Sequence, residues 1–223
     1  FKNIPILVLG FNRPELFDSC IRRLKSQDLD NIWVAIDGPR FGNSKDLINN
    51  QKIRNSCNLN KIDLNKTLFN EINLGCKNGV KKGITWFFKH NSEGIIIEDD
   101  IEIEKQYLKK IVGLLNHFKD DKEIFSISSY YEYGNIRKSF SKNNPVKFFK
   151  SPLCRVWGWA TWKDRWEKHL EISNQNLSQN PINCFFSLPK KFRTAHTALL
   201  LSFCESGKIN TWDYQWNFSH IYT

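Results

Sequence analysis

The chain has 223 residues, 40% of them apolar and 14% aromatic, which is enough to bury one substantial core in a single domain and excludes a disordered segment. No stretch approaches the ~20 consecutive apolar residues of a membrane span, and residues 1–10 lack the features of a secretory signal, so we expect a soluble chain. A net charge of +10 suits nucleic acid, an anionic membrane surface or a polyphosphate substrate, and does not choose among them.

The cysteines exclude two further classes of protein. They are scattered and form no Cys-x-x-Cys pair, so neither a zinc ribbon nor a disulfide framework is indicated, and a reducing cytosol is expected. The motifs of kinase-like ATPases, dehydrogenases, α/β-hydrolases and zincins do not occur either. The six cysteines are Cys20, Cys57, Cys76, Cys154, Cys184 and Cys204.

Short apolar runs alternate with segments of helical periodicity over the first 128 residues. This alternation predicts an α/β fold with a mostly parallel central sheet, helices on both faces and ligands at the carboxyl ends of the strands. Without a linker or a repeat, we expect one domain over residues 1–223. The expected strands are 4–9, 32–36, 94–97 and 124–128, with a weak helix and a short strand within 41–68, and the other expected helices are 14–24, 80–90, 107–118 and 193–204.

Three consecutive carboxylates, Glu98, Asp99 and Asp100, follow the buried strand that ends at Ile97. Like charges at a strand end repel one another, and partial burial penalises each ionised group, so a divalent cation would stabilise them. Oxygen ligands suit Mg²⁺ or Mn²⁺, which commonly bridge a carboxylate to substrate phosphates. On the motif alone, a solvated acidic turn that caps the next helix is equally compatible with these residues.

Several short segments occur in the order known from one superfamily of enzymes. Together with the acidic triplet, they resemble GT-A fold (Rossmann-like) glycosyltransferases, in particular bacterial nucleotide-diphospho-sugar transferases and the N-acetylglucosaminyltransferase I type. The resemblance covers nearly the whole chain and implies a nucleotide-sugar-binding half at 1–100 and an acceptor-binding half at 101–223. The segments are Phe11-Asn12-Arg13-Pro14, Ile36-Asp37-Gly38, Asn73-Leu74-Gly75-Cys76-Lys77 and Trp157-Gly158-Trp159-Ala160-Thr161-Trp162.

The resemblance implies roles for the residues at the strand ends. Asp37 accepts a hydrogen bond from the uracil N–H of a UDP donor, Arg13 lies against the nucleotide, and Asp100 is the direct ligand of Mn²⁺ or Mg²⁺. Glu98 and Asp99 contact ribose or metal-bound water. A turn-forming Asx residue is the alternative for Asp37, and a surface arginine is the alternative for Arg13.

Two further cations are candidates for the diphosphate. Lys77 follows the Asn73-Leu74-Gly75 turn, and Arg155 precedes the tryptophan block, from which it would reach the leaving group once a loop closes. Stacking of Arg155 on a tryptophan is the alternative. Trp157 and Trp159 offer flat faces for an acceptor sugar, although a core wall is the expectation for at least two of the four tryptophans between 157 and 166.

Asp213 is the candidate general base, because its aromatic neighbours would raise its pKa and its position resembles the late catalytic aspartate of the family. A helix N-cap is its alternative role, and Glu205 is the substitute base. His220 is left out of the ligand set, because a lone histidine is more often structural. Similar sequences continue past the position of Thr223, which leaves open a fragment or a disordered remainder.

These features predict a metal-dependent, inverting transferase that moves a hexose or an N-acetylhexosamine from a UDP-sugar to a glycan or lipid-linked acceptor, as in bacterial polysaccharide biosynthesis. It would act in the cytoplasm, with peripheral association at the inner face of the membrane. No basic stripe with interleaved aromatic residues indicates nucleic acid. A non-catalytic nucleotide- or sugar-binding module and a nucleotidyltransferase stay as alternatives, although residues 10–14 match a triphosphate-gripping loop poorly.

Overall fold

The computed structural model describes residues 2–128, 150–173 and 210–222, together with residues 185–186, 188, 190, 193–195, 197–199 and 202. Within these residues a six-stranded sheet has the order β3-β2-β1-β4-β6-β5. The neighbouring strands from β3 to β4 are parallel, β6 is antiparallel to β4, and β5 is antiparallel to β6. The strands are β1 (Ile6–Gly10), β2 (Ile32–Ile36), β3 (Thr67–Phe69), β4 (Glu93–Glu98), β5 (Ile127–Ser128) and β6 (Trp159–Trp162).

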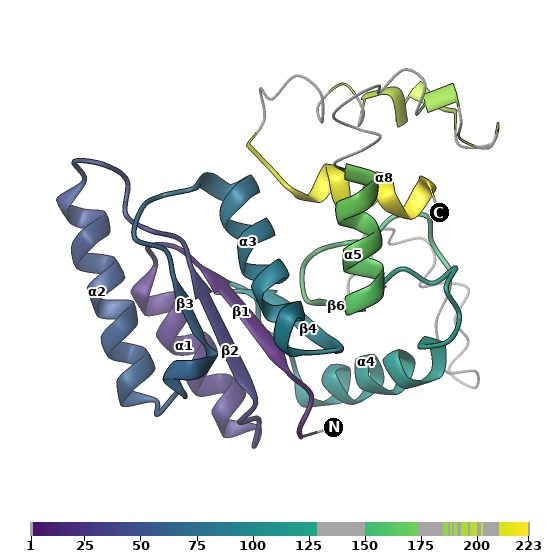
Figure 1. Ribbon diagram of the computed structural model, residues 1–223. Helices are drawn as coiled ribbons and strands as arrows, with labels where there is room; N and C mark the ends of the chain where they lie inside the picture. Colours follow the sequence, from purple (N-terminus) through teal and green to yellow (C-terminus); the bar gives the residue numbers. More distant parts are fainter. Residues whose placement is uncertain are drawn as a thin grey trace, which may run out of the picture.

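Helices cover both faces of the sheet (Figure 1). Alternate residues of the central strands supply the two cores: Ile6 and Val8 pack toward α1, α2 and α4, whereas Leu7 and Leu9 pack toward α3, α5 and α8. Strands buried on both faces form continuous apolar runs, which is why they stand out in the sequence. The helices are α1 (Pro14–Ser26), α2 (Ser44–Leu59), α3 (Gly75–His90), α4 (Lys105–Phe118), α5 (Lys163–Ile172) and α8 (Asp213–Tyr222), with a short 3₁₀ turn, η1 (Leu64–Lys66), before β3.

The expected α/β architecture is therefore confirmed as a mixed, mostly parallel sheet compatible with a Rossmann-like fold. Local sequence explains where the helices start. Pro14 occupies the first turn of α1, where its missing N–H costs no hydrogen bond. The side chain of Asn43 caps α2 by accepting from the Asp46 N–H at 3.0 Å. Within the described part of the chain, no helix has the length and apolar character needed to cross a bilayer.

Two expectations need correction. The strand expected at 124–128 is only Ile127–Ser128, and the aromatic block contains a strand, β6, that pairs with β4 from Glu93↔Trp162 to Ile96↔Trp159. Of the helix expected at 193–204, residues 195, 197–199 and 202 are helical in the described part of the chain, and residues 196, 200, 201, 203 and 204 lie outside it.

Candidate functional site

The carboxyl edge of the parallel strands gathers charged residues from separate parts of the chain. Arg13 follows β1, Asp37 follows β2, and the acidic triplet begins at the last residue of β4. Because these three strands are parallel neighbours, their ends meet at one edge of the sheet. This edge is the candidate site.

Arg13 bridges two of the three acidic residues. Its Nη2 donates to Asp99 Oδ1, and its Nη1 donates to Asp100 Oδ2 at 2.8 Å. The Asp99 side chain is fully buried, whereas that of Asp100 is 40% exposed. Burial alone would lower the pKa of Arg13, but the charges and hydrogen bonds of the two aspartates raise it above its ordinary value. Arg13 thus relieves part of the repulsion that the sequence predicts for this triplet.

Burial acts on two carboxylates of the triplet, Glu98 and Asp99. Burial raises the pKa of Glu98 above its ordinary value, and the charges of Asp100, Asp99 and Asp213 raise it further. Burial also raises the pKa of Asp99, against the opposing effect of Arg13. The second oxygen of Asp99, Oδ2, is buried and accepts no hydrogen bond from the described residues. Asp213 therefore lies within electrostatic range of Glu98.

Cys76 lies among the same carboxylates at the start of α3. Its thiol pKa is raised by burial and then by the charges of Glu98, Asp213 and Asp37. The sequence places Cys76 within a family-like segment but assigns it no role. The start of α3 therefore lies within electrostatic range of carboxylates from β2, β4 and α8.

Asp37 holds the start of α3 in place. Its carboxylate accepts from five donors: the backbone N–H groups of residues 38, 74 and 75 and the side-chain amides of Asn70 and Asn73, at 2.9–3.2 Å. Gly79 allows this approach, because a Cβ there would lie 3.0 Å from the Asp37 carboxylate. The Gly38 N–H lies only one residue on and Pro39 has no N–H, so Asp37 forms no Asx turn, and contact with uracil stays a prediction.

Asn210 meets the first turn of α3 from the far end of the chain. Its Oδ1 accepts from the Lys77 N–H at 3.0 Å. Gly75 has a φ of 77°, and a Cβ at Gly75 would lie 2.4 Å from Asn210 Nδ2. The positive φ favours glycine here, and a side chain at this position would also have to displace the amide of Asn210. Asn210 precedes Asp213 by three residues, so this contact also helps to position the start of α8.

A network of polar side chains next to the Arg13 loop was not predicted from the sequence. Asp46 is buried and accepts from Asn12 Nδ2 at 2.8 Å and from Arg40 Nε at 2.6 Å. The hydrogen bonds of Arg40 hold the pKa of Asp46 well below its usual range. Asn50 donates to the carbonyl of Asp37 at 3.1 Å, which links this network to the site.

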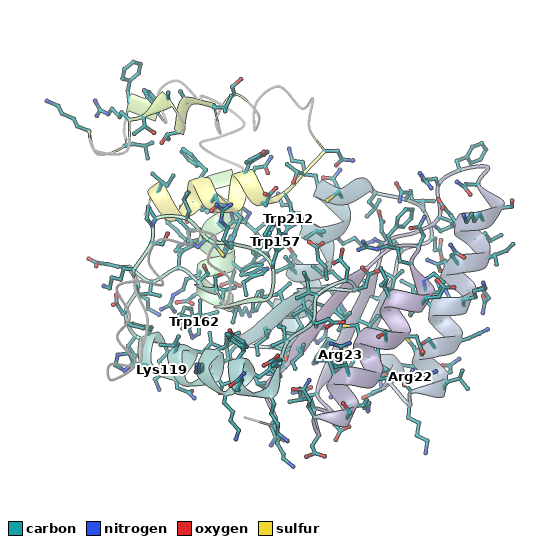
Figure 2. The ribbon with its side chains drawn as sticks, turned by 180° about the vertical axis from the view of Figure 1, so that it is seen from behind. Arg22, Arg23, Lys119, Trp157, Trp162 and Trp212 are labelled. Atoms are coloured by element: carbon teal, nitrogen blue, oxygen red, sulfur yellow. The ribbon has the colours of Figure 1, made fainter. Side chains whose placement is uncertain are left out.

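The tryptophan block is mainly structural. Trp159 is fully buried and lies against Trp212 and Trp216, with ring centroids 5.6 Å and 4.8 Å away. This corrects the expectation that Trp159 stacks on an acceptor sugar, because its faces are covered by the protein. Trp157 is 46% exposed, and Figure 2 shows it in the same region as Trp212, near α8. The carbonyl of Arg155 accepts from Ser128 Oγ at 2.6 Å.

Asp213 is the first residue of α8, and Thr211 Oγ1 donates to its Oδ1. The substitute base, Glu205, lies outside the described residues. His220 has a structural position: its Nδ1 donates to the Trp216 carbonyl at 2.9 Å, and its Nε2 contacts Ser126 Oγ at 2.6 Å. Burial lowers the pKa of His220 to about 4, so the ring is neutral at pH 7.

Comparison with known proteins does not assign the chain to a family. No protein-family model matches it, and no curated protein is significantly similar to it. Among the described residues, no three His, Cys, Asp or Glu side chains converge so as to hold a metal ion by themselves. The site is therefore interpreted from its own geometry.

Proposed function

We propose that this chain is a metal-dependent, inverting glycosyltransferase of the GT-A fold, which transfers a hexose or an N-acetylhexosamine from a UDP-sugar to a glycan or lipid-linked acceptor. One observation carries the proposal. Arg13 and the acidic triplet come from distant parts of the chain and contact each other at the carboxyl edge of a parallel sheet, where the charge of Asp213 also acts on Glu98. Such an edge is the usual ligand crevice of open α/β sheets.

The residues present fit one divalent cation held mainly by substrate. Asp100 offers a partly exposed carboxylate, and the buried Asp99 Oδ2 has no donor among the described residues. Mg²⁺ and Mn²⁺ accept one or two carboxylates with phosphate and water oxygens in the remaining positions. When bound, the cation would supply charge stabilisation for the departing diphosphate.

The protein's own cations would hold the donor. Arg13 is anchored to Asp99 through Nη2, and its Nη1, which donates to Asp100 at 2.8 Å, would turn to the phosphate when Asp100 takes the cation. The first N–H groups of α3 do not serve as a phosphate cradle, because Asp37 and Asn210 already accept from residues 74, 75 and 77. We therefore assign the diphosphate to Arg13 and the side chain of Lys77, with Arg155 as the cation that would reach it from the tryptophan segment.

Asp213 would act as the general base. Thr211 holds one of its carboxylate oxygens, and the buried Trp212 precedes it. In an inverting transfer, Asp213 accepts the proton of the acceptor hydroxyl while that oxygen attacks the anomeric carbon from the side opposite the leaving diphosphate. The exposed face of Trp157 would pack against the acceptor sugar.

Calorimetric titration of UDP tests the donor site. We expect UDP to bind in the presence of Mn²⁺, with weaker binding of CDP and GDP, and to lose its metal dependence in Asp100→Ala. Asp120→Ala, which removes an exposed acid elsewhere, is the matched control. Asp213→Asn should bind UDP like the wild type yet fail to transfer sugar. If no nucleotide binds under any of these conditions, the transferase proposal is wrong.

A non-catalytic nucleotide- or sugar-binding module is the second candidate. The pairing of Arg13 with both aspartates favours it, because the pair is partly neutralised without a cation. This candidate predicts that UDP binds equally well with and without Mn²⁺ and that Asp213→Asn has no effect on any measured property except stability. The same titrations therefore separate the two functions.

A further inference from the structure

Exposed apolar side chains gather around the loops at the carboxyl edge of the sheet. Phe41 is fully exposed, and Leu47, Ile48 and Ile72 are each more than half exposed. The loops that carry Phe41 and Ile72 lie together, since a Cβ on Gly38 would be 2.4 Å from the backbone of Ile72, and Leu47 and Ile48 lie at the start of α2, which follows the Phe41 loop. We call Phe41, Leu47, Ile48 and Ile72 the rim patch.

The first two turns of α2 have the reverse of the usual polarity. Asp46 and Asn50 point inward and are buried, whereas Leu47 and Ile48 are exposed. The inward polar groups are fixed by hydrogen bonds to Arg40, Asn12 and Asp37. Because these bonds set the orientation of the helix, the two apolar side chains are held at the surface. A buried polar group with exposed leucine and isoleucine beside it is the arrangement that signals an interaction surface.

Phe41 is presented by a tight turn. The Asn43 N–H donates to the Arg40 carbonyl at 3.1 Å, and Gly42 has a φ of 71°, which places Phe41 at the tip. No atom lies within 4 Å of the position that a Cβ on Gly42 would take. The turn thus holds the Phe41 ring at a position where only solvent or a binding partner can contact it.

Cations flank the rim patch. The segment 39–54 contains Arg40, Lys45, Lys52 and Arg54, and its one acid, Asp46, is buried. Lys45 and Lys52 are exposed on the same helix as Leu47 and Ile48. Apolar tips between exposed lysines are typical of surfaces that lie in the interface of an anionic bilayer, where the apolar groups enter the acyl boundary and the cations meet the phosphates.

We propose that the rim patch docks this protein on an anionic lipid bilayer. The net charge of +10 adds a long-range attraction to the same surface. Docking in this way turns the carboxyl edge, and the candidate site on it, toward the membrane. Preference for a lipid-linked over a free glycan acceptor follows from this orientation, and that step alone rests on the proposed function.

Vesicle co-sedimentation tests the docking without any sugar substrate, so its failure is distinguishable from failure of the transferase proposal. The wild type should bind phosphatidylcholine vesicles that contain about one third phosphatidylglycerol, bind pure phosphatidylcholine much more weakly, and be released by salt. Phe41→Ser combined with Leu47→Ser should weaken binding at least about tenfold. Lys45→Gln and Lys52→Gln should each weaken it about fivefold.

Leu59→Ser and Leu64→Ser are the matched controls. Both side chains are exposed leucines, but Leu59 is the last residue of α2 and Leu64 begins η1, next to the exposed Asp63, so both lie away from the start of α2. These variants should bind vesicles like the wild type, and circular dichroism should show that all variants keep the fold. The inference is overturned if the wild type ignores anionic vesicles, if the controls lose as much binding as the rim variants, or if the rim variants instead abolish a dimer or binding to an oligonucleotide.

Discussion

Asp37→Asn separates a structural role of this residue from a ligand-binding role. In the wild type, Oδ1 and Oδ2 each face three N–H groups, with Leu74 N shared between them. Asparagine has the same shape, but its NH₂ group must face donors in either orientation. At least two donors would then lose their acceptor, and each unmatched donor costs about 1–3 kcal/mol. We expect the substitution to destabilise the fold by about 3–4 kcal/mol.

Thermal unfolding followed by circular dichroism measures this effect. For a chain of this size, 1 kcal/mol corresponds to roughly 2–4 °C, so Tm should fall by roughly 10 °C. The Tm of the Asp37→Ala variant should fall by a similar amount. Asp30→Asn is the control, because Asp30 is exposed and its ion pair with Lys25 is a surface contact worth less than about 1 kcal/mol.

The opposite outcome has a definite meaning. If Asp37→Asn unfolds at the same temperature as the wild type but loses UDP binding, the hydrogen bonds from the five donors contribute nothing to stability and the carboxylate is available to a ligand, as the uracil interpretation requires. That result would show that Asp37 does not hold the start of α3 in place. A variant that is both destabilised and unable to bind UDP would assign Asp37 both roles.

Four further substitutions test the effects of burial and backbone geometry. Burial lowers the pKa of His169 to about 3 and that of His220 to about 4, so below about pH 6.5 the unfolded chain binds protons that the folded chain does not. The free energy of unfolding should therefore fall by about 1.4 kcal/mol per pH unit for each histidine as the pH is lowered. The substitution His169→Gln should make the dependence of Tm on pH less steep. Gly75→Ala should lower stability by about 1–3 kcal/mol in urea titrations, whereas Gly113→Ala, inside α4 with open space around it, should raise it by about 0.5–1 kcal/mol. Because burial and neighbouring carboxylates raise the pKa of Glu98, Glu98→Gln should raise Tm at neutral pH, and the gain should disappear toward acidic pH.

The central strands of the sheet could be predicted because each one is recognisable from its own short stretch of sequence. The strands β1, β2 and β4 are buried on both faces, so each is a continuous apolar run that stops at a turn residue or a charge. Strand β6 was missed because it is short and aromatic and pairs with β4 across about 65 residues of chain. Nothing in its own pattern separates a strand from an aromatic loop.

The site was predictable only as far as strand ends define it. Arg13 and the acidic triplet follow neighbouring strands, and the structure places them in contact. Asn210 and Asp46 were not identified, because their partners lie 133 and 34 residues away and are chosen by side-chain hydrogen bonds rather than by periodicity. Trp157 and Trp159 look equivalent in the sequence, and only the packing of α8 against the sheet decides that Trp159 is covered.

The pairing at Arg13 connects the stability of the acidic strand end to its proposed use. Arg13 and a divalent cation compete for the same carboxylates, but the competition is unequal. Asp99 is fully buried and keeps its bond to Arg13, whereas Asp100 is 40% exposed and exchanges its partner at lower cost. Asp100 is therefore the carboxylate that a cation would take. Arg13, released on one side, would then present its free Nη1 toward the diphosphate that the cation brings.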